Sequence, residues 1–160
     1  MRRLTPAARK LTLTVHVAAG VGWLGVLAVM ILLAATGLTT GDRTLLDAVY
    51  VTAGEVVWLV FPFAAISLVS GIILAVGTAW GLFRHVWVTA KLVINVAMLA
   101  VSGAVLSRFV EEAADRARHG VAVGDLGPRI LVGSTAGFVL LVVATALSVY
   151  RPRGRVGRAR

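Results

Sequence analysis

Three ionisable side chains lie within long apolar stretches of the sequence: His16, Glu55 and Lys91. A charged side chain is costly in the hydrocarbon of a bilayer, so each of these residues is a candidate functional residue by default. Histidine can bind a metal ion or transfer a proton, and lysine can pair with an anion. These residue types therefore point to cofactor or anion binding.

Polar and small residues recur beside the first candidate at helical spacing. His16, Gly20, Trp23 and Leu27 share one helix face. Gly20 leaves room on this face for a flat ligand or a neighbouring helix. We predict that His16 and Trp23 are cofactor-binding residues. The alternative is that His16 hydrogen-bonds a neighbouring helix while Trp23 packs in the core.

A second polar stripe contains the lysine. Trp87, Lys91, Asn95 and Ser102 recur at helical spacing in an otherwise apolar segment, which predicts that the stripe faces inward. We predict that Lys91 and Asn95 are cofactor-binding residues. In the alternative interpretation, the long stem of Lys91 extends to the lipid headgroups.

The histidine and the lysine are predicted to lie at the same depth. His16 is five residues past Leu11, where the first uncharged stretch starts, and Lys91 is five past Val86, where the third span starts. The two spans run in the same direction, and a helix rises about 1.5 Å per residue. A pocket is therefore predicted between helices 1 and 3. Glu55 belongs near the opposite face and should not pair with Lys91.

The elements that must position these residues are membrane-spanning helices. Of the 160 residues, 59% are hydrophobic and only 14% are charged, which excludes an ordinary water-soluble domain. The predicted fold is all-α, a four-helix transmembrane bundle over residues 11–150. A basic N-terminal segment precedes it and a basic, disordered tail follows. The four spans cover about 11–36, 49–76, 86–107 and 130–150, the N-terminal segment is 1–10, and the tail is 151–160.

The basic residues indicate orientation. Ten of the 16 Lys and Arg lie in residues 1–10, at Arg84 or in the tail, and five lie on the other side of the predicted membrane. The positive-inside rule then predicts that both termini are cytoplasmic. The net charge of +9 is thus assigned to topology, and no nucleic-acid partner is expected. The chain has no cysteine, so disulfides and thiolate metal sites are excluded.

Aromatic and basic residues gather where the third span begins. Trp80, Arg84, His85 and Trp87 are predicted to be membrane-interface anchors. His85 lies about 9 Å shallower than His16 by helix rise. Haem ligation by the two histidines together is therefore disfavoured.

Two departures from regular helices are also predicted. Pro62 lacks a backbone N–H and should kink or open the second span near Trp58. The third helix should continue beyond the bilayer, because Glu112 and Arg116 are spaced as an i,i+4 pair, and should break at Gly120.

A stripe of small residues follows in the second span. Ser67, Gly71 and Ala75 recur every fourth residue, a pattern suited to close helix contact within the bundle or between protomers. A homo-oligomer or a membrane partner protein is therefore one expectation, alongside the lipid bilayer itself.

Two segments resemble a known group of proteins. KLTLTVHVAAGVGWLG (Lys10–Gly25) and WGLFRHVWVTAKLVINV (Trp80–Val96) are similar to an uncharacterised group of bacterial four-helix integral membrane proteins. More distantly, the chain resembles the superfamily that contains the copper-resistance CopD domain and the HemJ-type protoporphyrinogen oxidases. The distant resemblance rests on a first-helix histidine with a tryptophan seven residues later and on a third-helix lysine-leucine pair, here His16, Trp23, Lys91 and Leu92.

The resemblance implies a cofactor. In HemJ-type enzymes the first-helix histidine is associated with haem b and the lysine segment with the active region, so haem or porphyrin binding is implied near His16 and Lys91, with His16 as the axial ligand of the haem iron. A HemJ-type Leu-Pro-Arg-Leu stretch is replaced here by aliphatic residues within 24–33, so enzymatic activity is left open. The leading hypothesis is a haem- or porphyrin-associated membrane redox protein. The alternative is a non-catalytic assembly partner or small transporter subunit.

Overall fold

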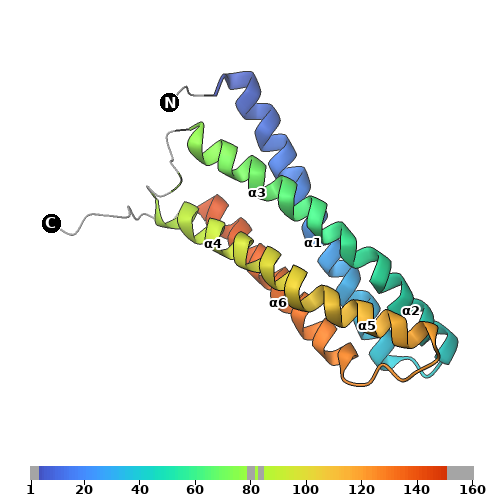
Figure 1. Cartoon of the computed structure of the whole chain (residues 1–160). Coiled ribbons are helices and arrows are strands. Elements are labelled where there is room, and N and C mark those ends of the chain that lie inside the picture. The colour runs from blue at the N-terminus through green and yellow to red at the C-terminus, as the bar shows by residue number, and fades with distance from the viewer. Residues whose placement is uncertain (1–3, 79–81, 83–84, 151–160) are drawn as a thin grey trace.

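Four long helices form an antiparallel bundle (Figure 1). The computed structural model describes residues 4–78, 82 and 85–150. The predicted disordered tail, Trp80 and Arg84 lie outside these residues. All four helices are long and apolar enough to cross a membrane, and each predicted span lies inside one of them. The elements are α1 (Pro6–Thr39), α2 (Arg43–Val56), a 3-10 turn η1 (Val57–Leu59), α3 (Val60–Val76), α4 (Val86–Val101), a π-helical turn η2 (Ser102–Leu106), α5 (Ser107–Arg118) and α6 (Leu126–Tyr150).

Side-chain caps set the starts of the first two helices. Thr5 accepts a hydrogen bond from the Ala8 N–H at 3.3 Å, and Pro6 occupies the first helical position. Asp42 accepts from the N–H groups of Thr44 and Leu45, at 2.8 and 3.4 Å. Both caps satisfy backbone donors that the helix itself cannot pair.

The second span departs from regular α-helix near Trp58, where the sequence predicts a kink or an opening, and the departure is a 3-10 turn. The helix tightens to 3-10 geometry over Val57–Leu59, just before Pro62. Because proline has no N–H, the carbonyl of Trp58 cannot receive the usual bond from four residues ahead. The π-helical turn Ser102–Leu106 in the third helix is not predicted by the sequence.

The extension of the third helix is confirmed. α5 continues to Arg118, and Arg116 pairs with Glu112 one turn before it. The helix then breaks at Gly120, whose φ of 67° is a left-handed conformation that suits glycine.

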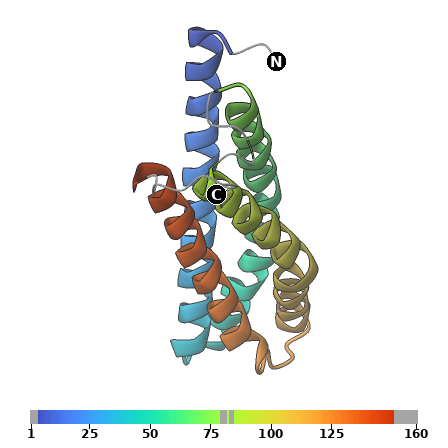
Figure 2. The same cartoon turned by 90° about the vertical axis from the view of Figure 1, so that its left-hand side faces the viewer.

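The core runs along the bundle axis, where α1 packs against α3 and α6 and α2 packs against α5 (Figure 2). Large side chains from several helices are fully buried there, among them Trp23, Leu27, Met30, Val57 and Ile130. Many outward-facing side chains are exposed valines and leucines, as expected of helices that contact lipid.

Acidic residues occupy only one half of the bundle, which we call the acidic half. It contains the C-terminal end of α1, α2, α5 and the start of α6. All seven Asp and Glu of the chain lie in it, within residues 42–55 and 111–125. The opposite half, formed by the start of α1, the end of α3, the start of α4 and the end of α6, has none.

Candidate functional site

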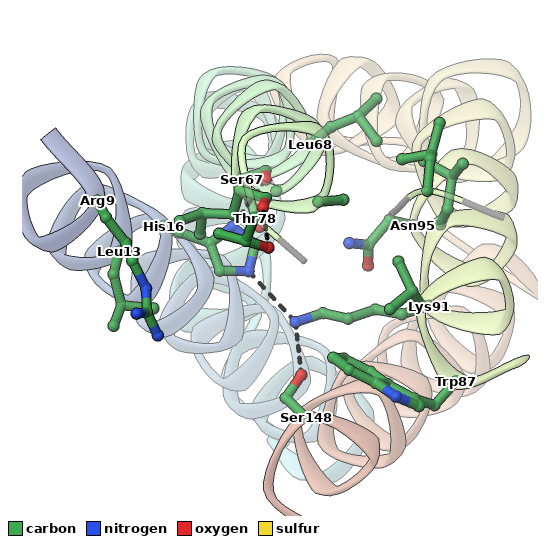
Figure 3. A pocket seen from close by; sticks show the side chains of 16 residues that line it. Arg9, Leu13, His16, Ser67, Leu68, Thr78, Trp87, Lys91, Asn95 and Ser148 are labelled. Atoms are coloured by element: carbon green, nitrogen blue, oxygen red, sulfur yellow. Dashed lines mark hydrogen bonds between the residues drawn. The ribbon is translucent and has the colours of Figure 1, made fainter. Parts of the chain in front are cut away.

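A pocket of about 220 Å³ lies in the half without acidic residues, between α1, α3, α4 and α6 (Figure 3). Much of its wall is aliphatic, with leucines contributed by α1, α3 and α4. Polar side chains gather on the same walls. They are Arg9, His16, Ser67, Thr78, Trp87, Lys91, Asn95 and Ser148.

His16 is held by α3. Its Nδ1 lies 2.9 Å from the backbone carbonyl oxygen of Ser67 and 3.1 Å from Ser70 Oγ. The Ser70 hydroxyl itself donates to the carbonyl of Ile66. Because a carbonyl oxygen can only accept, we assign the proton to Nδ1, which leaves Nε2 as an acceptor facing the pocket.

Lys91 reaches across the pocket to two other helices. Its Nζ lies 3.2 Å from His16 Nε2 and donates to Ser148 Oγ at 2.7 Å (Figure 3). Lys91, on α4, therefore contacts α1 and α6 at the same time. This contact confirms that His16 and Lys91 share the same depth. The side chain turns inward rather than extending to the headgroups.

A glycine makes room for the histidine ring. A Cβ atom built on Gly71 would lie 3.1 Å from His16 Cε1, closer than most real contacts. Ser67 and Ala75, on the same stripe, are buried in the bundle. The small-residue stripe thus serves packing of α3 against α1 within the chain, and any partner protein would need another surface.

Asn95 lines the same pocket one helical turn deeper than Lys91. The residue is only 6% exposed, and its Oδ1 atom has no hydrogen-bond partner within the described part of the chain. A buried amide oxygen without a partner costs about 1–3 kcal/mol.

The pocket is electrostatically one-sided. Arg9 and Lys91 both line it, and no Asp or Glu stands among the lining residues that the structure describes. The five ion pairs between described residues all lie in the acidic half. An ammonium group with no counter-charge is unfavourable at low dielectric. The pocket therefore favours an anion.

Not all of the other predicted site residues line the pocket: Trp87, predicted to be an interface anchor, does so, but Trp23, His85 and Glu55 do not. Trp23 is completely buried in the core and does not line the pocket; its Nε1 has no partner among the residues described. His85 also lies outside the lining, and its ring centroid is 6.5 Å from that of Trp87. Glu55 pairs with Arg118 at 3.1 Å, which confirms that it does not contact Lys91.

Three polar pocket residues, Arg9, Thr78 and Ser148, are not identified by the sequence pattern. Arg9 belongs to the basic N-terminal segment, although it precedes His16 by seven residues and so shares its helix face. Ser148 adds only modest polarity to the fourth helix. Nothing in its own segment identifies it as the partner of Lys91.

Haem b does not fit the pocket as it is formed. The Nε2 atom that would bind iron is already in contact with Lys91 Nζ. The volume of about 220 Å³ is also small for a macrocycle of the size of haem. Across the described residues, no group of three or more His, Cys, Asp or Glu is placed to hold a metal ion.

Comparison with known proteins gives no relative for this chain: no family model matches it, and neither does a curated protein or a solved structure.

Proposed function

We propose that this chain is a multi-pass protein of the bacterial cytoplasmic membrane that binds an organic anion in the pocket between its four helices. Lys91 is the main anion-binding side chain. Arg9 adds positive charge nearer the N-terminal end of α1. The observation that carries the proposal is a lysine held inside an apolar pocket with no acidic side chain in that half of the bundle.

The geometry of Lys91 supports this role. An ammonium group has three N–H donors. Two of them are accounted for by His16 Nε2 and Ser148 Oγ. We assign the third to the bound anion. The two fixed contacts hold the amine in place, so little side-chain entropy is lost when the ligand binds.

The proposed orientation places the pocket in the cytoplasmic half of the membrane. It follows from the ten basic residues on that side against five on the other. The ligand would then enter from the cytoplasm or the inner leaflet.

Binding of hexanoate to the detergent-purified protein, measured by calorimetry, tests the proposal. Lys91→Met should weaken binding about tenfold or more, because a charge-assisted hydrogen bond is lost. Lys10→Met is the matched control, since Lys10 is an exposed cation on α1 that does not line the pocket. Unchanged hexanoate binding by a folded Lys91→Met variant would refute the anion site, as would a wild-type protein that binds no hexanoate.

A haem-associated role is a second candidate, implied by the resemblance to the HemJ-type proteins. One observation favours it: His16 donates its Nδ1 proton to a backbone carbonyl, the arrangement that orients metal-binding histidines. Haem binding requires Lys91 to move away from His16 Nε2 and the helices around the pocket to separate. A Soret band in the purified wild type, lost in His16→Ala, would support it; absence of the band after reconstitution with haem would count against it.

A further inference from the structure

Resting on this proposed anion site, we infer that the ligand carries a second polar group, a hydrogen-bond donor that binds the side-chain amide of Asn95. The ligand class is an organic acid with an apolar body and a hydroxyl or amide N–H about one helical turn from its anionic group.

The buried amide is the first observation. Asn95 is 6% exposed, and Oδ1 has no partner on any residue the structure describes. Figure 3 shows the side chain directed into the same space as Lys91, with no bond drawn to it. This oxygen accepts no hydrogen bond from the described residues, and a ligand donor that reaches it would supply the missing bond.

The spacing of the two side chains defines the ligand. Lys91 and Asn95 are four residues apart on one face of α4, or about 6 Å along the helix axis. The surrounding wall is aliphatic, with Leu68 on α3 and Leu92 on α4. A ligand would match the order of these side chains if it placed an anionic group at Lys91, an apolar linker along the leucines and a hydrogen-bond donor at Asn95.

Other anions match the wall less well. A dicarboxylate would place its second charge against the unpaired oxygen of Asn95. No Lys or Arg lies at that level among the described lining residues, since the two that line the pocket are Arg9 and Lys91. A plain fatty acid would leave the amide oxygen unpaired, and sites built to hydrogen-bond a hydroxyl discriminate against analogues that lack one. Inorganic phosphate would leave the aliphatic wall uncovered.

A matched pair of probes tests the inference. Hexanoate and 6-hydroxyhexanoate share an apolar chain and a carboxylate and differ in one terminal hydroxyl. The wild type should bind the hydroxylated acid about tenfold more tightly, as expected for one buried hydrogen bond. Asn95→Leu, which keeps the branching at Cγ but removes the amide, should abolish this preference while still binding hexanoate. Asn95→Val gives the same readout if Asn95→Leu does not purify.

The outcomes separate the two proposals. Equal affinity of the wild type for both acids, or a preference that persists in both Asn95 variants, would overturn the inference and leave the anion site standing. Failure of Lys91→Met to weaken either acid would overturn the anion site itself. Hexyl phosphate and 6-hydroxyhexyl phosphate form a second pair, in which tighter binding than the carboxylates identifies a lipid-like phosphate as the anionic group. Within this second pair, we expect the wild type to prefer 6-hydroxyhexyl phosphate over hexyl phosphate by the same factor.

Discussion

At the scale of single residues, the pocket depends on which atoms donate and which accept. The carbonyl of Ser67 assigns the proton of His16 to Nδ1, and Nε2 then accepts from Lys91. Counting residues from the span edges is enough to place His16 and Lys91 together. It cannot show that Trp23 turns to the core, because helical spacing defines a face but not the neighbour that the face meets. The contact to Ser148 depends on the packing of α6, which no local pattern in the sequence reveals.

Gly71→Ala tests how closely the ring of His16 is packed. The added methyl would lie 3.1 Å from His16 Cε1 and 3.4 Å from Nδ1, so the ring or α3 must shift. Gly25→Ala is the control, since Gly25 is an exposed helical residue and a methyl group added there would meet no heavy atom within 4 Å. We expect Gly71→Ala to be less stable than Gly25→Ala by about 1–3 kcal/mol, the usual cost of overpacking. Thermal melting in detergent measures the difference, and equal stability of the two variants would show that the ring yields freely.

At the scale of elements, the departures from ideal helix geometry lie in the second and third long helices of the bundle, Arg43–Val76 and Val86–Arg118. Pro62 predicts a departure from regular geometry near Trp58, because its missing N–H is a local property of the sequence, but the predicted kink or opening does not specify the 3-10 turn that forms there. The π-helical turn Ser102–Leu106 has no such local signature. It lies where Gly103 faces Phe61 across the bundle, 3.3 Å from where a Cβ would be. An irregularity caused by a proline is thus readable from sequence, whereas an irregularity set by packing between helices is not.

Close approach of α2 and α5 gives a prediction at this scale. A Cβ atom on Gly54 would lie 2.9 Å from the Cβ of Ala114, and neither atom can rotate away. Gly54→Ala must therefore push the helices apart, and we expect a loss of about 1–3 kcal/mol in the free energy of unfolding. Gly20→Ala, where nothing lies within 4 Å, is the control for helix propensity. Denaturation by sodium dodecyl sulfate compares them; a Gly54→Ala variant as stable as the control would contradict the packing of α2 against α5.

At the scale of the whole molecule, charge is separated along the bundle. The seven acidic residues and the ion pairs lie in one half, and the pocket with Arg9 and Lys91 lies in the other. Exposed pairs such as Glu55 with Arg118 contribute little to stability, about 0–1 kcal/mol. The basic residues matter more for orientation, because the side of the membrane with more Lys and Arg is the one generally retained in the cytoplasm.

The absence of cysteine makes this orientation directly testable. Ala7→Cys and Thr44→Cys each introduce one thiol at an exposed position, near the start of α1 and at the start of α2. We expect a membrane-impermeant maleimide to label Thr44→Cys in intact cells and Ala7→Cys only after lysis. The reverse pattern would place the termini outside and the pocket in the outer half.

The four walls of the pocket come from four separate helices. The site therefore does not exist until the bundle has assembled, and an occupant that binds only the assembled state stabilises it by mass action. In the cell, this would make the abundance of the protein depend on the supply of its ligand. A chain that lacks its ligand would open more often at this end and would be removed sooner by membrane proteases.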